Sequence, residues 1–150
     1  VLATMHNTQI EQVMRVNAFA PMVLAKYACR SMMLAREGRI VNISSIIAQT
    51  GFSGLTSYGA SKAALEGFTR SLAREVGRAG IAVNAVAPGY MATEMTSALE
   101  GSQLDSIVRR SPFRELATVD DVAGAVAYLV GPDAGRITGT VLTVDAGSTA

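Results

Sequence analysis

The sequence is poor in the residues that build metal sites and disulfides. It has one cysteine, Cys29, and one histidine, His6, among 150 residues. A single cysteine excludes an internal disulfide and a multi-cysteine metal site, so we predict no bound metal. Unpaired cysteine is also typical of a reducing compartment, and we expect a cytoplasmic protein.

Neither sign of charge is in excess. Thirteen Lys and Arg residues stand against twelve Asp and Glu residues, which gives a formal net charge of +1. This balance offers no electrostatic basis for binding nucleic acid or an anionic membrane. The apolar runs fall short of the roughly 20 residues of a membrane span, and residues 1–6 lack the pattern of a signal peptide. We therefore expect neither nucleic acid nor a membrane as partner.

What the sequence does contain is hydrophobic residues, 49% of the chain, enough for one core but not for two domains. Apolar residues with helical spacing follow Thr8 and Glu11, which we interpret as a capping box, and predict a long helix over residues 8–36. A short apolar strand is predicted over 39–44. The Gly- and Ser-rich stretch 48–57 indicates a loop, with Ser57 as a candidate cap for the next helix.

The second half repeats this alternation. We predict a helix over 58–79, a buried strand over 81–87, and a last strand over 141–144. Residues 91–111 show no strand pattern and are interpreted as a lid over a site. Thr118 and Asp121 form a second capping box before a helix that ends at Gly131.

This order predicts an α/β fold, the C-terminal half of a Rossmann-like, doubly wound parallel sheet with about three strands and flanking helices. The first of these strands would expose an uncovered edge, which folded proteins avoid. We therefore expect further structure before residue 1.

Tyr58 and Lys62 carry the sharpest chemical signal. A spacing of four on a helix places both side chains on one face, one turn apart. A free phenol has a pKa near 10, and a neighbouring ammonium favours the phenolate. The pair could therefore exchange a proton near neutral pH. An exposed amphipathic pair is the alternative interpretation.

Ser45 strengthens the catalytic interpretation. It follows the first strand at the carboxyl edge of the sheet, where open α/β folds bind ligands, and the Tyr58 helix starts from the same edge. Its hydroxyl could hold a carbonyl oxygen of a substrate. Without Tyr58, Ser45 would read equally well as a turn or cap serine.

Asn17 interrupts the apolar stripe of the first helix, which is costly unless its polar groups find partners. Pro21, four residues on, has no N–H, so the main-chain carbonyl of Asn17 loses its usual helical donor. That carbonyl could bind a water. A helix kink with a locally satisfied Asn17 is the alternative.

Pro88, Gly89 and Met91 leave the second strand at the same edge, followed by Thr93. Gly89 allows the backbone to approach a flat ligand, and Thr93 offers a hydroxyl. We interpret the segment as a grip for a nicotinamide, although an isolated Pro-Gly would be only a turn.

Together these residues and motifs resemble the C-terminal half of members of the short-chain dehydrogenase/reductase family. The resemblance covers essentially the whole chain and is carried by Asn17, Ser45, Tyr58, Lys62, Val83-Asn-Ala-Val-Ala-Pro-Gly, Ile137-Thr-Gly and Val144-Asp-Ala-Gly. Gly38-Arg-Ile-Val-Asn-Ile-Ser-Ser and Ser71-Leu-Ala-Arg-Glu-Val are most similar to its 3-oxoacyl-[acyl-carrier-protein] reductase group. Many other members of the family share those two segments, so the match to this group is less specific than the match to the family.

The resemblance implies an NAD(P)(H)-dependent oxidoreductase that reduces a ketone, such as a 3-oxoacyl thioester, to a secondary alcohol or catalyses the reverse. It implies that Tyr58 transfers the proton, Lys62 assists Tyr58 and binds the nicotinamide ribose, and Ser45 orients the carbonyl. Asn17 would hold the water of a proton relay, while Met91 and Thr93 would meet the nicotinamide.

The family's glycine-rich first turn, its cofactor selector and its Asn-Asn-Ala-Gly strand end are not in this sequence. The resemblance thus implies that residues 1–150 are a single C-terminal catalytic part without the N-terminal nucleotide-binding half. Its subgroup favours NADP(H) over NAD(H), and its helices favour a homodimer or homotetramer. In the C-terminal strand region, Ala146 stands where relatives often have glycine.

Two other functions are alternatives to an oxidoreductase. A non-catalytic fragment that only pairs with partner subunits would retain the helical faces but would not bind the cofactor. A serine hydrolase explains the sequence poorly, because Gly-x-Ser-x-Gly and Ser-x-x-Lys are both lacking and His6 lies ahead of the first helix.

Overall fold

The computed structural model describes residues 1–91 and 101–150. Its centre is a parallel sheet of three strands in the order β1-β2-β3. The strands are β1 (Gly38–Ile43), β2 (Ile81–Pro88) and β3 (Val141–Val144). The predicted α/β fold and its three parallel strands are confirmed.

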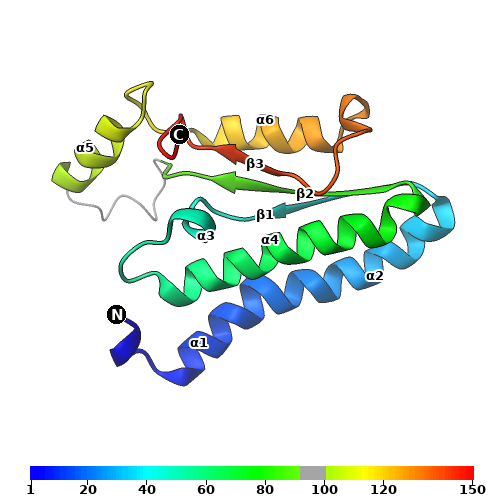
Figure 1. The fold of residues 1–150 in the computed structure, drawn as a ribbon, viewed down its shortest axis with the longest axis horizontal. Helices are drawn as coiled ribbons and strands as arrows, with labels where there is room; N and C mark the ends of the chain where they lie inside the picture. The colour runs from blue at the N-terminus through cyan, green and yellow to red at the C-terminus, as the bar shows by residue number, and fades with distance from the viewer. Residues whose placement is uncertain (92–100) are drawn as a thin grey trace.

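Helices cover both faces of this sheet (Figure 1). On one side lie α1 (Asn7–Met14), the π-helical turn η2 (Arg15–Phe19), α2 (Ala20–Ala35) and α4 (Thr56–Val76). On the other side lies α6 (Val119–Val130). The remaining described helices are η1 (Leu2–Thr4), α3 (Ile47–Thr50), η3 (Gly77–Ala79), α5 (Gly101–Arg110) and η4 (Pro132–Ala134).

β2 is the central strand, and all eight of its residues are buried. One apolar cluster joins it to α2 and α4 and contains Cys29, Ala73, Val76, Ile81 and Val83. A second cluster joins it to α6 and η4 and contains Val86, Leu129 and Ala134. A parallel strand covered on both faces needs apolar residues at nearly every position, which is why the run 81–87 predicts it well.

Two predicted helix starts are wrong. α1 begins after His6, whose N–H donates to the side-chain oxygen of Gln9 at 3.0 Å, so Thr8 and Glu11 do not form the capping box. A glutamine at the third helical position reaches back to the N-cap as a glutamate would. Ser57 is not a cap, because α4 begins at Thr56 and Ser57 is buried in its first turn.

The second capping box is confirmed. The Asp121 carboxylate accepts a hydrogen bond from the Thr118 N–H at 2.8 Å, and the Thr118 hydroxyl oxygen accepts one from the Asp121 N–H at 3.1 Å. Hydrogen bonds from the Thr118 hydroxyl and N–H hold the pKa of Asp121 below its ordinary value. The start of α6 is therefore set locally, as the sequence predicts.

The predicted lid, residues 91–111, is only partly described. It contains α5 and, before it, Met91, which forms an isolated parallel bridge with Ala117. In the described part of this stretch no strand forms, as predicted, and Met91 makes only this single bridge. Across the two described ranges, the chain contains no helix with both the length and the apolar composition to cross a membrane.

Candidate functional site

The carboxyl ends of the three strands meet the start of α4 at one end of the molecule, on the left in Figure 1. Ser45 lies two residues beyond β1 and is 8% exposed, while Tyr58 and Lys62 occupy the first two turns of α4. The structure thus brings these three predicted residues to one edge of the sheet, because parallel strands end on the same side.

Lys62 is half-buried and faces both the strand and the tyrosine. Its Nζ donates a hydrogen bond to the carbonyl oxygen of Ile43 at 2.8 Å and lies 5.7 Å from the centre of the Tyr58 ring. Burial lowers the pKa of the ammonium, since water no longer fully solvates the charge. An ammonium has three donors, so Lys62 can bind further acceptors besides Ile43.

Ser45 is held by the turn that follows it. Its Oγ accepts a hydrogen bond from the N–H of Ile47 at 3.2 Å, and the N–H of Ile46 donates to the carbonyl of Pro88 at 3.1 Å. The hydroxyl proton of Ser45 takes no part in the bond with Ile47. Ser45 therefore has a fixed oxygen and a proton that it can donate to a carbonyl oxygen.

Asn17 lies in a π-helical turn. The N–H of Ala20 donates to the carbonyl of Arg15, five residues back, which is the π pattern often found at functional sites. The Asn17 side chain donates to Ser61 Oγ at 3.1 Å, and Ser61 in turn donates to the Tyr58 carbonyl at 2.7 Å. The side chain is thus satisfied by α4. The water held by its main-chain carbonyl stays a prediction.

Close packing against Asp145 requires glycine at position 89, which the sequence did not indicate. Its N–H donates to the Val144 carbonyl at 2.9 Å, and a Cβ at this position would lie 2.6 Å from the Cβ of Asp145. Only glycine allows this approach. Pro88 pairs with Val144 at the end of the sheet, and Thr93 lies outside the described residues. Contact of this segment with a cofactor remains a prediction.

Tyr90 was missed by the sequence analysis. Its hydroxyl is buried without a hydrogen-bond partner among the described residues, and its ring meets that of Phe52 edge-on, with centroids 6.1 Å apart. Burial raises the pKa of Tyr90, while the positive charge of Arg110 opposes that rise. An aromatic residue directly after Pro-Gly at a strand end was the signal that could have found it.

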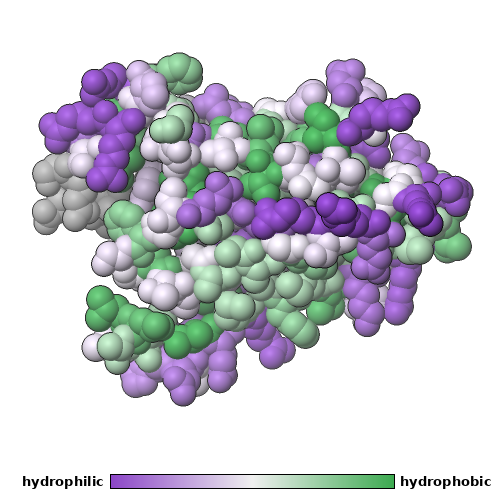
Figure 2. Space-filling view, viewed as in Figure 1, coloured by the Kyte–Doolittle hydropathy of each residue, from purple (hydrophilic) through white to green (hydrophobic). Residues whose placement is uncertain are grey.

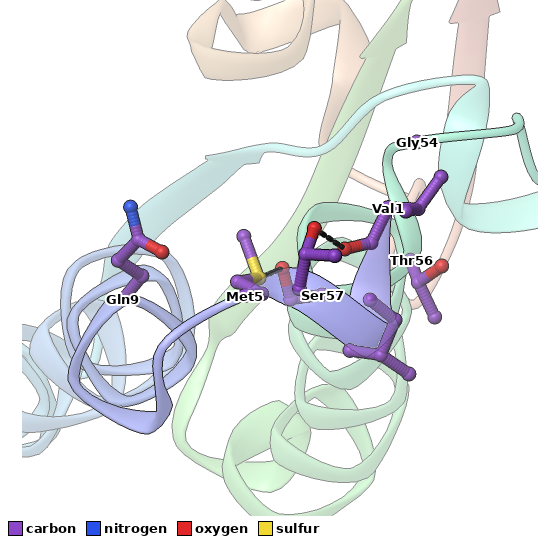
Figure 3. A pocket seen from close by; sticks show the side chains of 8 residues that line it. Val1, Met5, Gln9, Gly54, Thr56 and Ser57 are labelled. Carbon is purple, nitrogen blue, oxygen red and sulfur yellow. Dashed lines mark hydrogen bonds between the residues drawn. The ribbon is translucent and has the colours of Figure 1, made fainter.

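A separate pocket of about 180 Å³ lies where the N-terminal segment packs on the start of α4 (Figure 3). Two of the residues that line it are joined by a hydrogen bond, which Ser57 Oγ donates to the sulfur of Met5 at 3.4 Å. Val1 and Gly54 also line it. Ser45, Tyr58 and Lys62 do not line this pocket, so we place the candidate site at the edge of the sheet instead.

The described residues contain no cluster of three or more His, Cys, Asp or Glu that could hold a metal ion. The groups at the sheet edge are instead hydroxyls and one ammonium. Such donors bind oxygen atoms of an organic ligand, which the carboxyl edge of an open α/β sheet commonly accepts.

The fold defines a Rossmann-type α/β protein, and the candidate site lies at the carboxyl edge of its sheet, where such folds commonly bind ligands. A family model described as enoyl-(acyl carrier protein) reductase matches residues 2–149. The chain belongs to the short-chain dehydrogenase/reductase family.

Among curated relatives, the chain is 44% identical over 147 residues to 3-oxoacyl-[acyl-carrier-protein] reductase FabG of Haemophilus influenzae, covering 98% of this chain and 61% of that protein. For the protein of the same name from Rickettsia bellii, the identity is 43% over 143 residues, with 95% and 59% covered. The chain therefore spans about 60% of the length of these relatives.

Solved structures agree in fold. ElxO with NADP bound superposes with a TM-score of 0.90 at 36% identity, covering 99% of this chain and 61% of that one. A gluconate 5-dehydrogenase from Burkholderia cenocepacia in complex with NADP and tartrate gives a TM-score of 0.95 at 29% identity, with 99% and 59% covered.

Proposed function

We propose that this chain carries the catalytic groups of an NADP(H)-dependent oxidoreductase that reduces a ketone to a secondary alcohol or catalyses the reverse. One observation carries the proposal: the half-buried ammonium of Lys62 lies 5.7 Å from the Tyr58 ring, at the edge where Ser45 follows β1. A phenol beside an ammonium is suited to proton transfer.

Each residue has a distinct role in this reaction. Tyr58 gives its phenolic proton to the carbonyl oxygen during reduction and takes it back from the alcohol during oxidation. Ser45 donates a hydrogen bond to the same oxygen, where negative charge develops. Lys62 supplies positive charge beside Tyr58, and its remaining donors bind ribose hydroxyls. The main-chain carbonyl of Asn17 holds a water molecule that extends the proton relay to Lys62.

The donor set fits a nicotinamide nucleotide at its ribose end. One N–H of the Lys62 ammonium donates to the Ile43 carbonyl, and the other two N–H groups can donate to the two vicinal hydroxyls of a ribose. When bound, the nicotinamide supplies or accepts the hydride. Pro88, Gly89, Met91 and Thr93 would hold its carboxamide end.

The similar proteins support a more specific proposal for the cofactor, the substrate and the cellular compartment. ElxO and the gluconate 5-dehydrogenase both hold NADP in their solved structures, which favours NADP(H) over NAD(H). The curated relatives are 3-oxoacyl-[acyl-carrier-protein] reductases, which favours a 3-oxoacyl thioester as substrate. Those bacterial relatives also support our proposal of a cytoplasmic protein.

The test is oxidation of NADPH by the complete protein in which this sequence occurs, with 3-oxoacyl thioesters and simple ketones as substrates. Tyr58→Phe removes the proton donor and little else, so turnover should fall at least about 1,000-fold while NADPH affinity stays within about threefold. Tyr27→Phe is the matched control, because Tyr27 is 56% exposed on α2, and it should keep wild-type turnover. Turnover that survives Tyr58→Phe would contradict the proposal.

We also propose that the protein is a homodimer or homotetramer. Large apolar residues remain exposed along η2 and α2, namely Val16, Phe19, Leu24, Met33 and Leu34. Others gather over the N-terminal segment, where Val1 and Leu2 are exposed (Figure 2). Exposed apolar surface of this kind supports subunit contact. Sedimentation equilibrium of the complete protein should give a mass of two or four chains, and a monomer would contradict this.

A measurement of cofactor binding distinguishes the proposed enzyme from the alternative, a non-catalytic fragment that only binds partner subunits. The proposed enzyme quenches or enhances NADPH fluorescence in a saturable titration. A complete protein that assembles into oligomers but binds no NADPH would support the alternative instead.

A further inference from the structure

A seam of polar contacts, two of them buried and one made by the half-buried Lys62, joins β1 and the residues just beyond it to α4. Asn42 Nδ2 donates to Thr69 Oγ1 at 2.8 Å, Ser44 Oγ donates to Glu66 Oε1 at 2.9 Å, and Lys62 Nζ donates to the Ile43 carbonyl at 2.8 Å. Apolar contacts have no preferred direction, whereas hydrogen bonds demand a narrow range of distance and angle. Each of these hydrogen bonds therefore restrains the sliding of α4 along the strand at the residues that it joins.

Glu66 is the residue of this seam whose burial most opposes folding. The residue is 4% exposed, and Arg70, whose side chain is 54% exposed, reaches its carboxylate only at 3.6 Å. Burying a carboxylate beside an incomplete ion pair opposes folding unless hydrogen bonds compensate. An apolar side chain here would pack against the sheet without that cost, so stability alone does not explain glutamate at this position.

The partner of Glu66 sits between the groups of the candidate site. Ser44 is 3% exposed, and its N–H donates to the Val86 carbonyl at 2.7 Å, which anchors it in the sheet. It lies between Ile43, which holds Lys62, and Ser45. On α4, Glu66 lies one turn beyond Lys62 and two turns beyond Tyr58 on the same face.

We propose that Glu66, through its hydrogen bond with Ser44, is a positioning residue that sets the spacing between Ser45 and the Tyr58–Lys62 pair. This role rests on the oxidoreductase function proposed above. The carbonyl oxygen must meet Ser45 and Tyr58 at once, and those two groups come from different elements. A small slide of α4 along β1 separates them without unfolding either element.

The experiment measures kcat, KM and NADPH affinity of the complete protein with Ser44→Ala, Glu66→Leu and Glu66→Gln. A displacement of about 1 Å costs on the order of 100-fold in rate, so Ser44→Ala and Glu66→Leu should lower kcat by about 10- to 100-fold. NADPH affinity should change less than about threefold, because the cofactor-binding groups remain. Glu66→Gln keeps the acceptor oxygen and should hold kcat within about threefold of wild type.

Thr69→Val is the matched control. It removes the neighbouring link of the same seam, from Asn42 to Thr69, but at a point further from Tyr58. It should lower the melting temperature while kcat stays within about threefold of wild type. An equal loss of kcat in Thr69→Val and Glu66→Leu would overturn the positioning role, since the seam would then act only through stability.

The two proposals fail in different ways. Wild-type kcat retained by a folded Ser44→Ala protein would overturn the positioning role alone, and this small substitution keeps the test open if Glu66→Leu does not fold. A wild-type protein that turns over no ketone would overturn the proposed function and, with it, this inference.

Discussion

The ammonium of Lys62 donates a hydrogen bond to the carbonyl of Ile43 at 2.8 Å, so the cation beside Tyr58 is tied to the last residue of β1. This bond draws Lys62 inward, and burial lowers the pKa of its ammonium below the ordinary value of 10.5. The positive charge of Lys62 is therefore lost at a lower pH than in an exposed lysine.

Lys62→Met should separate the electrostatic part of this arrangement from its packing. The folded protein releases the Lys62 proton before the unfolded chain does, so unfolded molecules bind more protons between the lowered pKa and 10.5. Wild-type stability should thus rise with pH across this window relative to Lys62→Met, as measured by urea unfolding. Parallel pH profiles of the two proteins would contradict a buried ammonium. Turnover and NADPH affinity should both fall in the variant.

Gly80→Ala should be strongly destabilising. Gly80 has φ +78°, and a Cβ there would collide with the carbonyl oxygen of Arg36 at the end of α2. Positive φ alone costs an alanine about 1–2 kcal/mol, and the collision adds to it. Gly54→Ala is the control, because Gly54 has φ +87° with open space around it. Chemical denaturation should show the larger loss for Gly80→Ala, and equal losses would contradict the collision.

Ala146→Gly should stabilise the protein. Ala146 has φ +53°, a conformation that favours glycine, while the Ser111 hydroxyl bonds to its carbonyl at 2.7 Å. Relief of the strain outweighs the extra freedom of glycine in the unfolded chain, so we expect a gain of about 0.5–1 kcal/mol. Ala127→Gly, at an exposed position inside α6, should instead lose about 1 kcal/mol. A loss at both positions would contradict the prediction.

Tyr90→Phe should raise the melting temperature of the ligand-free protein. The Tyr90 hydroxyl is buried with no partner among the described residues, and an unpaired buried hydroxyl costs about 1–3 kcal/mol. Phenylalanine keeps the edge-on contact with Phe52 and removes that cost. Differential scanning calorimetry checks the shift, with Tyr128→Phe, at a half-exposed position on α6, as the neutral control. A lower melting temperature for Tyr90→Phe would show that the hydroxyl is paired in solution.

Local signals in the chain were sufficient for most of the fold. The apolar run of β2, the Thr118–Asp121 capping box and the four-residue spacing of Tyr58 and Lys62 each depend on neighbours in the sequence, so they could be predicted. The boundary errors at Thr8 and Ser57 came from the same source, because several nearby residues can cap a helix and packing selects among them.

What the sequence by itself determined is the order of helices and strands, the three parallel strands and the family, since repeating patterns of apolar residues and short motifs encode them. Only the tertiary structure decided the partners of buried polar groups. Asn17 meets Ser61 across 44 residues, Ser44 meets Glu66 across 22, and Gly89 accommodates Asp145. Such pairs depend on which elements pack together and at what register, and no local pattern records that choice.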